Sequence, residues 1–389
     1  MNSYPFGKLK ETLGGIYIHI PFCKQACYYC DFHFSTSLKK KKELIEALVK
    51  ELQLRKSEFK DIAVATIYFG GGTPSILTDE ELQLLIDAVY DNYKVVDDPE
   101  ITLEANPDDL SKERIYKLAK TPINRLSIGI QSFFEEDLKL MNRAHNAQEA
   151  KECLSVASRY FDNISIDLIY GVPGATNEQW LQNIETALSY NIPHVSSYAL
   201  TVEPKTAFAS FIKKKIMNDV NDEQAHEQFH ILKDYLEGKE FIHYELSNFG
   251  KENYFSKNNT AYWQGKPYIG IGPSAHSFNG KQRSWNVRNN AKYIKSLQEN
   301  KLPMEIETLT KVDRYNEYVM TGLRTIWGVS LEKVEQDFDT TFKDYLLEQA
   351  NVFINRQMLY IEAEHLKVTK KGQFLSDGIA SELFKLNLS

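Results

Sequence analysis

The sequence predicts an α/β protein: a partial TIM-type (β/α) barrel followed by a small, mainly helical, winged-helix-like C-terminal domain. Three observations predict this fold. Short runs rich in β-branched residues alternate with longer helical patterns, polar or glycine-rich residues follow nearly every such run, and the alternation stops near Pro303. Strands that alternate with helices at intervals of about 30 residues are typical of parallel βαβ units. We expect a barrel domain over residues 1–300 and a second domain over residues 301–389.

Six runs of residues that favour β structure are the strand candidates of the barrel. They span residues 15–20, 66–69, 101–105, 125–130, 164–169 and 195–200. Five helical patterns separate them, over residues 41–56, 79–90, 112–119, 148–159 and 178–189. Thr78 and Asn177 stand just before two of these patterns. Both are candidate N-caps, because their side-chain oxygens can accept hydrogen bonds from the first free backbone N–H groups of a helix.

The C-terminal part follows a different pattern. Helical stretches are expected over residues 311–326, 331–338 and 341–354, followed by two short strands over 358–361 and 365–368 and a final helix from Lys371. Helices followed by a small hairpin indicate a compact winged-helix-like domain.

Polar and glycine-rich residues follow one predicted strand after another. Gly70 to Pro74 come after the second strand, Glu104 to Pro107 after the third, Gln131 after the fourth and Asp167 to Gly174 around the end of the fifth. The carboxyl ends of parallel strands meet at one face of a barrel, where functional sites are built. Turns would explain the glycines and prolines but not the recurring Glu, Gln and Asp, so we expect the functional site at this face.

The composition excludes several classes of protein. A net charge of −7 offers no basic surplus to neutralise phosphates, so nucleic acid is not expected to be the main partner. Neither a signal-peptide pattern nor an apolar run of about 18 residues occurs, so association with a membrane is conceivable only without a spanning segment. Four cysteines are too few for a disulfide framework, and a cytoplasmic protein is expected.

Three of the four cysteines form a tight group after the first strand. Cys23, Cys27 and Cys30 have the spacing C-x3-C-x2-C. Three such thiolates can each bind one iron of a [4Fe–4S] cluster, and the fourth iron is then free to chelate S-adenosylmethionine (SAM) for reductive cleavage to a 5′-deoxyadenosyl radical. The alternative is a zinc site, for which His19 or His33 would have to supply the fourth ligand. The remaining cysteine, Cys153, is expected to be a buried structural thiol.

The cysteine spacing and its neighbouring motifs resemble a known family. The strand before the cysteines reads YIHIPF, the second strand is followed by GGGTPS, and DLIYGVPG and Asn142-Arg143 lie further along. Together these motifs resemble the radical SAM superfamily, and within it the group that contains oxygen-independent coproporphyrinogen III dehydrogenases (oxidases) and the HemW-type haem chaperones. The resemblance covers essentially the whole chain. It implies a [4Fe–4S] cluster on the three cysteines and a SAM site formed by Tyr17, Tyr29, Gly71, Gly72, Thr73, Glu104, Gln131, Arg143, Asp167 and Ala199.

The resemblance also implies a role for each residue type in the SAM site. The two tyrosines would border the cluster, and the Gly71-Gly72-Thr73 backbone would approach the methionine part of SAM, where side chains would obstruct it. Glu104 would accept from an amino or hydroxyl group, Gln131 and Asp167 would contact the ribose, and Ala199 would lie beneath the adenine. The charged fork of Arg143 suits a carboxylate. A helix cap or a structural salt bridge is the alternative for Glu104 and Asp167.

Two features favour the haem-chaperone branch of this group. The dehydrogenase branch has a further cysteine two positions after the last cluster cysteine, where this chain has Phe32, and only residues 1–14 precede the first strand. The chaperone interpretation implies haem as cargo, an acceptor haemoprotein and an electron donor. Radical decarboxylation of coproporphyrinogen III is the enzymatic alternative, and a binding module with a purely structural cluster is the third. Whether the protein is an enzyme stays open at this point.

A motif linked to haem in the chaperone branch, H-N-x-x-Y-W, is altered here. The matching stretch runs from Asn258 to Trp263, with Asn258 in the histidine position. An amide is a poor ligand for haem iron, which prefers imidazole, thiolate or phenolate. His243 and His276 are nearby sources of imidazole, and a buried aromatic pair is the structural alternative. The candidate haem-binding residues are Asn259, Tyr262, Trp263 and His276.

Overall fold

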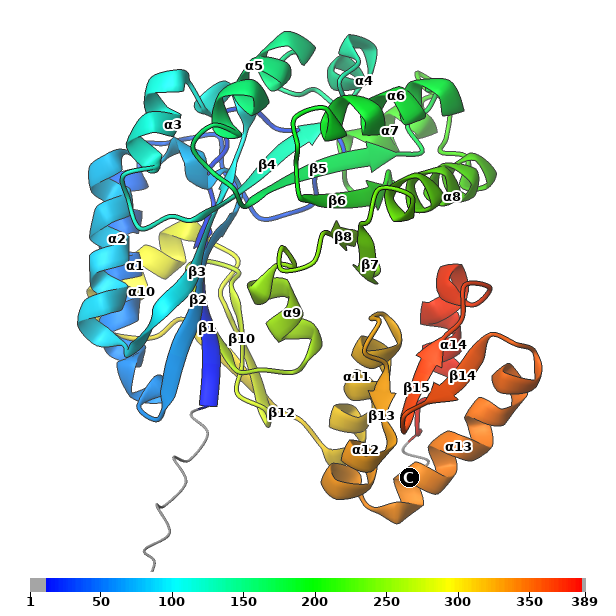
Figure 1. Ribbon diagram of the computed structural model, residues 1–389. Coiled ribbons are helices and arrows are strands. Elements are labelled where there is room, and N and C mark those ends of the chain that lie inside the picture. Colours follow the sequence, from blue (N-terminus) through cyan, green and yellow to red (C-terminus); the bar gives the residue numbers. More distant parts are fainter. Residues whose placement is uncertain (1–11, 387–389) are drawn as a thin grey trace, which may run out of the picture.

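The computed structural model describes residues 12–386; residues 1–11 and 387–389 of the two predicted domains lie outside this range. Six parallel strands lie side by side in sequence order at the centre of one large sheet (Figure 1). The sheet curves but does not close, because β12 and β7 form its two free edges. The predicted partial barrel is therefore confirmed. Its parallel strands are β1 (Thr12–Ile20), β2 (Ile62–Gly71), β3 (Val95–Ala105), β4 (Arg125–Gln131), β5 (Ile164–Tyr170) and β6 (His194–Ala199).

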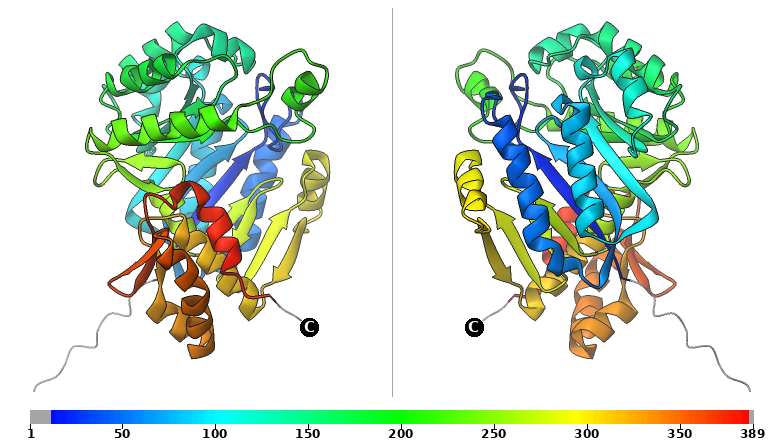
Figure 2. Two further views of the ribbon diagram at one scale, coloured as in Figure 1. Left: turned by 90° about the vertical axis from the view of Figure 1, so that its right-hand side faces the viewer. Right: turned by 90° about the vertical axis from the view of Figure 1, so that its left-hand side faces the viewer.

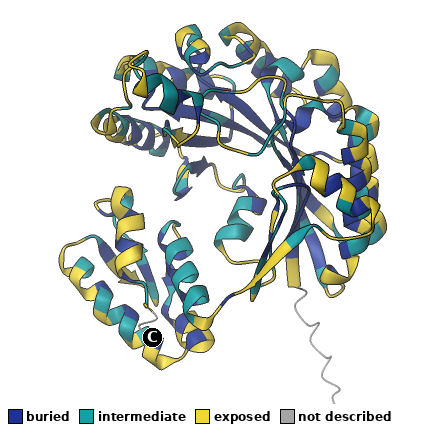
Figure 3. Ribbon diagram, turned by 180° about the vertical axis from the view of Figure 1, so that it is seen from behind, coloured by how far each residue is buried: buried dark blue, intermediate teal, exposed yellow. Residues whose placement is uncertain are grey.

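The helices that connect these strands lie on the outer side of the sheet (Figure 1). They bury the apolar residues of both layers in one continuous core, and Figure 3 shows the burial concentrated in the sheet and on the inward helix faces. A short helix after β4, which was not predicted, adds to this layer. The helices are α1 (Lys41–Arg55), α2 (Asp79–Asn92), α3 (Lys112–Leu118), α4 (Glu135–Leu140), α5 (Ala147–Ala157) and α6 (Asn177–Leu188).

Capping residues set where two of these helices begin. Thr78 caps α2 as predicted: its hydroxyl accepts from the Glu81 N–H while the Glu81 carboxylate accepts from the Thr78 N–H. The second predicted cap was wrong by one residue, since Thr176 rather than Asn177 caps α6. Gln179 stands three positions after Thr176 and returns the hydrogen bond, which completes the reciprocal arrangement that a cap at Asn177 would lack.

Short elements that the sequence patterns did not predict extend the sheet at both ends. Beside β1 lies the parallel strand β9, followed by an antiparallel meander, and β8 and β7 pair antiparallel beyond β6. Each of these strands has three to five residues, too few for a clear alternating pattern. They are β7 (Ile242–Glu245), β8 (Asn248–Gly250), β9 (Tyr268–Ile271), β10 (His276–Phe278), β11 (Gln282–Asn286) and β12 (Met304–Thr308). Four helices accompany them: α7 (Ala207–Lys213), α8 (Asp222–Glu237), α9 (Lys257–Trp263) and α10 (Asn290–Gln298).

A buried ion pair fastens the meander to the barrel. Glu51 and Arg55 are one turn apart in α1, and both side chains are enclosed. The Arg55 guanidinium donates to the Gly270 carbonyl at 2.8 Å, and the Glu51 carboxylate accepts from the Gly272 N–H at 2.9 Å and from the Asn286 amide at 2.8 Å. Each charge is therefore paired and hydrogen-bonded, which burial requires.

The C-terminal domain has a core of its own, centred on Tyr315, Leu346 and Leu366. Its final helix begins at Ser376 instead of the expected Lys371, because a turn closed by Gly372 and a short 3-10 helix (Gln373–Leu375) come first. Its elements are α11 (Lys311–Leu323), β13 (Val329–Ser330), α12 (Leu331–Phe338), α13 (Thr340–Asn355), β14 (Leu359–Glu362), β15 (His365–Val368) and α14 (Ser376–Glu382).

The two domains meet on the inner side of the curved sheet. The Ile326 N–H donates to the Tyr244 carbonyl at 3.1 Å, and Thr325 forms a β-bridge with Glu245. In Figure 2 the loop with the cysteines (blue) and the C-terminal domain (orange to red) lie at opposite ends of the molecule. Since β12 still belongs to the large sheet, we propose that the boundary expected at 300/301 lies near Leu309.

Candidate functional site

A cavity of about 490 Å³ lies at the carboxyl ends of β1 to β6, at the face that the strand-end residues indicated. The three cysteines and all ten residues of the expected SAM site line it. They come from six strand ends and from loops far apart in the sequence. The parallel sheet is what brings them together, because it carries every strand to the same end.

The cysteines lie on the loop between β1 and α1. The Cys23 N–H donates to the Ser35 carbonyl at 3.1 Å and the Cys30 N–H to the Cys27 carbonyl at 3.3 Å, so the loop folds back on itself. All three cysteines are partly exposed free thiols. Burial raises the pKa of Cys30 to about 11 and also raises the pKa of Cys23. Metal binding at these thiols must therefore displace protons, as metal–thiolate bonds require.

The donor set fits a cluster better than one metal ion. Within residues 12–386 no three His, Cys, Asp or Glu side chains are placed to hold a single ion. The cysteine ligands of a cubane cluster each bind a different iron, so their sulfur atoms need not point at one common metal position. His19 and His33, the candidate fourth zinc ligands, are engaged elsewhere: His19 Nε2 lies 3.1 Å from the His33 carbonyl, and His33 Nε2 lies 2.7 Å from Asn290 Oδ1.

Two glycines allow the cysteine loop to pack against β2. A Cβ atom on Gly72 would lie 2.7 Å from the Phe22 carbonyl oxygen and 3.0 Å from Cys23 Sγ. Gly71 has a φ of +113°, and a Cβ there would lie 2.5 Å from His19 Nδ1. The protein's own atoms thus exclude side chains at both positions, and the space beside Cys23 stays open.

Arg143 connects the cysteine loop to the sheet. Its Nη1 donates to Cys27 Sγ at 3.4 Å and to the Tyr29 hydroxyl at 3.2 Å. Its Nη2 donates to Asn106 Oδ1 and to the Gly129 carbonyl, both at 2.8 Å. The guanidinium therefore spans from the cysteines to the ends of β3 and β4. Its buried Nε has no partner among the described residues and is the donor left for a ligand.

Two carboxyl groups face the same cavity. Glu104 accepts from the Tyr68 hydroxyl at 2.9 Å and from the Gly71 N–H at 3.2 Å. Burial raises the pKa of Glu104 to about 7 and that of Asp167 to about 6. Within the described chain neither one caps a helix or forms an ion pair, so the two structural alternatives for these residues find no support. Acceptors held without a cationic partner suit the hydroxyl and amino groups of a polar ligand.

The remaining predicted residues complete the wall. The hydroxyl of Tyr17 lies 3.2 Å from His19 Nδ1, and its ring stacks on Tyr68 at 6.0 Å. Gln131 has a φ of +67°, an uncommon conformation for a residue other than glycine that turns the chain at the end of β4. Ala199 ends β6 and leaves room beside the strand.

The four haem candidates lie elsewhere and do not converge. None lines the 490 Å³ cavity. Asn259, Tyr262 and Trp263 lie on α9, where the Tyr262 ring packs 4.4 Å from Tyr268 and the Trp263 ring lies beneath a guanidinium of the C-terminal domain. His276 lies on β10 beside Trp285. The altered motif residue Asn258 is buried and accepts from the Thr66 hydroxyl at 3.1 Å.

Several cavity residues were not predicted. Asn106, Ser127 and Gly129 line the cavity near Arg143, and Tyr198 and Thr201 line it at the end of β6. Asn106 lies in the polar stretch noted after the third strand, and Thr201 follows the end of β6, so the strand-end rule would have found both. Tyr198 lies inside a strand, and the sequence gives no sign of which side it faces.

The fold and the cysteine-lined cavity define a protein of the radical SAM superfamily. The model of this superfamily matches residues 17–187, and the model of the HemN C-terminal domain matches residues 309–375. The heme chaperone HemW of Lactococcus lactis is 34% identical over 93% of this chain and 95% of its own length, and that of Bacillus subtilis is 33% identical over 93% and 97%. The chain belongs to the HemW family, which confirms the resemblance inferred from its motifs.

The solved structure of coproporphyrinogen III oxidase (HemN) from Escherichia coli has the same fold. It matches with a TM-score of 0.84 at 23% identity and covers 97% of this chain and 92% of its own. This likeness confirms the predicted barrel and C-terminal domain. Among the described residues, no helix has the length and apolar character needed to cross a membrane.

Proposed function

We propose that this protein is a haem chaperone, which binds haem and delivers it to acceptor haemoproteins. The observation that carries the proposal is the similarity to heme chaperones across both domains, over 93% of the chain. Phe32 supports the same branch: it lines the mouth of the cysteine cavity with 70% of its surface exposed, where the dehydrogenase branch has a further cysteine.

We infer that Cys23, Cys27 and Cys30 hold a [4Fe–4S] cluster and that the rest of the cavity holds SAM. When bound, the cluster would supply an electron and an open coordination position. The chain's own contribution is positioning. Arg143 fixes the cysteine loop relative to β3 and β4, and Glu104 offers a buried acceptor. The aromatic rings of Tyr17 and Tyr29 limit the entry of water.

Further parts of the proposal concern the partners of the protein and its cellular compartment. Delivery of haem requires an acceptor haemoprotein, and a redox-active cluster requires an electron donor. Three free cysteines in one cavity favour a reducing compartment such as the cytoplasm, and a net charge of −7 gives no reason to expect nucleic acid.

Decarboxylation of coproporphyrinogen III is the competing activity, and one experiment separates the two. Anaerobically reconstituted protein is incubated with SAM, a strong reductant and coproporphyrinogen III, and the porphyrins are analysed by mass spectrometry. We expect unchanged substrate. Loss of two carboxyl groups as carbon dioxide would make the protein an enzyme and overturn the chaperone proposal.

Haem binding and delivery are tested directly. We expect about one haem per chain in a titration followed at the Soret band, and transfer of that haem to an apo-haemoprotein such as apomyoglobin. Transfer from this protein must be faster than transfer from haem bound to serum albumin, which is the control carrier. No Soret change at micromolar haem would contradict the proposal.

A further inference from the structure

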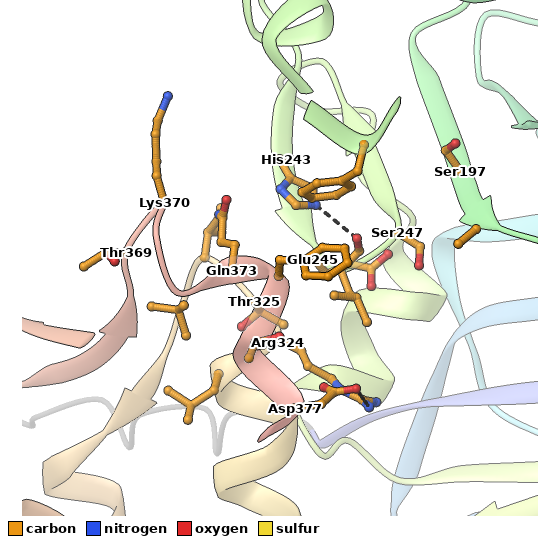
Figure 4. A pocket seen from close by; sticks show the side chains of 18 of the residues that line it. Ser197, His243, Glu245, Ser247, Arg324, Thr325, Thr369, Lys370, Gln373 and Asp377 are labelled. Carbon is orange, nitrogen blue, oxygen red and sulfur yellow. Dashed lines mark hydrogen bonds and ion pairs between the residues drawn. The ribbon is translucent and has the colours of Figure 1, made fainter. Parts of the chain in front are cut away.

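A second cavity, larger than the first, lies between the two domains (Figure 4). Its volume of about 810 Å³ falls within the range of roughly 300–1,000 Å³ that is typical of ligand and cofactor sites. One wall consists of the end of β6 and the turn between β7 and β8. The other consists of the end of α11, of β15 and of the segment that leads into α14.

Large aromatic side chains face this cavity with much of their surface open. Tyr198 is 46% exposed, Tyr360 39% and Phe374 51%, and Phe229 lies 6.2 Å from the Phe374 ring. Aromatic rings are normally buried or packed, and their exposure on both walls of one cavity indicates a flat apolar ligand. The cavity thus offers the surface that a macrocycle needs.

Cationic side chains lie among these rings. Arg324, Lys367 and Lys370 line the cavity, against two carboxyl groups, Glu245 and Asp377. Burial raises the pKa of Glu245 to about 7, which weakens its negative charge near neutral pH. Each cation is ion-paired, Arg324 with Asp377, Lys367 with Glu362 and Lys370 with Glu237, and these partly exposed pairs can share their N–H donors with the carboxylates of a ligand.

One of these cations links the cavity to the altered motif on α9. The Arg324 guanidinium donates to both carboxylate oxygens of Asp377, at 2.7 and 2.8 Å, and lies 5.8 Å from the centre of the Trp263 ring. Figure 4 shows the pair of Arg324 and Asp377 at the edge of the cavity. Trp263 is then a positioning residue, which holds Arg324 in the wall through a cation–π contact.

The cavity also adjoins the cysteine-lined one. Tyr198, Ala199 and Thr201 line both. A ligand in the larger cavity would lie beside the site where we place SAM, separated from it by the end of β6.

We propose that the cavity between the domains is the tetrapyrrole site, with the macrocycle against Tyr198, Tyr360 and Phe374 and its propionates toward Arg324 and Lys367. This inference rests on the proposed function and adds the place of binding. It replaces the haem site expected at Asn259, Tyr262, Trp263 and His276, of which Trp263 contacts the wall through Arg324.

The test uses metal-free protoporphyrin IX, because the iron ligand is a separate question. His243, labelled in Figure 4, is the histidine in the wall, but its Nε2 lies 3.1 Å from the Leu246 carbonyl oxygen and its Nδ1 is enclosed. Affinity for a metal-free porphyrin, measured by fluorescence anisotropy, reports on the cavity itself.

Steric blocking is the first measurement. Ser247 lines the cavity and its hydroxyl makes no hydrogen bond to the described chain, so Ser247→Trp fills the space without breaking a contact. We expect affinity for the porphyrin to fall at least tenfold. Ser57→Trp, on the exposed outer side of the barrel, is the matched control and should bind like the wild type. Equal affinity in both variants would overturn the inference while haem binding by the wild type still stands.

Charge removal is the second measurement. Lys367 pairs with Glu362 at 2.8 Å and Lys343 with Glu335 at 2.7 Å, and the two lysines are similarly exposed, but only Lys367 lines the cavity. We expect Lys367→Ala to weaken protoporphyrin binding about two- to fivefold, the effect of one partly exposed ion pair, and Lys343→Ala to have no effect. A porphyrin without carboxylates should bind both variants equally. A similar loss for that porphyrin would refute the placement of the propionates. Absence of porphyrin and haem binding in the wild type would instead refute the proposed function.

Discussion

Arg143→Lys tests whether the guanidinium fork organises the cluster and SAM cavity. Lysine keeps the positive charge but replaces a planar fork with a single ammonium group. The fork makes four contacts, two toward Cys27 and Tyr29 and two toward the ends of β3 and β4. A lysine ammonium can contact either the cysteine loop or the ends of β3 and β4, but not both at once. The variant therefore separates charge from geometry at this position.

The magnitude follows from the hydrogen bonds that a lysine cannot make. A hydrogen bond to a charged group contributes about 1.5–3 kcal/mol. Because the cavity admits water, which can replace part of this contribution, we count one bond rather than two. At about 1.4 kcal/mol per factor of ten, SAM should bind about 10- to 150-fold more weakly than to the wild type.

The assay is equilibrium dialysis of SAM against anaerobically reconstituted protein, with iron content measured on the same samples. Arg114→Lys is the control. Arg114 is also largely buried and pairs with Asp79 and the Leu77 carbonyl, but it lies outside the cavity and should leave SAM binding unchanged. SAM affinity within about twofold of the wild type at equal iron content in Arg143→Lys would refute the reasoning.

Three further predictions concern the cluster, pH and stability. Cys23→Ala should abolish the absorbance near 400 nm and lower the iron content of reconstituted protein, whereas Cys153→Ala, which changes a buried thiol of α5, should retain both. Glu104 has a pKa of about 7 in the fold, above its usual 4.5, so the folded state holds a proton that the unfolded state releases. Its contribution to stability must fall as pH rises from 4.5 to 7, by at most roughly 3 kcal/mol, and urea unfolding at pH 5 and pH 8 should show a smaller difference in Glu104→Gln than in the wild type. Glu51→Ala removes one of the two carboxylates paired with Arg55, the other being Glu58, and takes the acceptor from the Gly272 N–H; it should lower the free energy of unfolding by about 2–4 kcal/mol, against less than about 0.5 kcal/mol for the exposed Glu46→Ala.

The barrel and its site were predictable because one rule links them. Parallel strands with helical crossovers place every strand end at one face, so polar residues after successive strands had to meet. That is why Glu104, Gln131 and Asp167, which lie on three different strands, line one cavity with the cysteines. The rule needs only the order of strands and helices, which residue patterns reveal.

The region between residues 200 and 308 was not predictable in the same way. Its strands are short and its helix α9 has seven residues, so periodicity is too weak to define them. The expected haem residues illustrate a second limit of prediction from sequence. A sequence motif does not reveal which side of a helix faces a cavity, and Trp263 faces Arg324 of the other domain, a contact between residues 61 positions apart. The cavity between the domains depends on such long-range packing.

The wall shared by the two cavities has a thermodynamic consequence. Tyr198, Ala199 and Thr201 face both spaces, so a ligand that displaces them in one cavity alters the other. Linkage requires such an effect to be reciprocal: if SAM changes the affinity for the tetrapyrrole by some factor, the tetrapyrrole changes the affinity for SAM by the same factor. The end of β6 would then set how strongly cargo loading depends on the state of the cofactor site, through equilibrium alone and without any turnover of SAM.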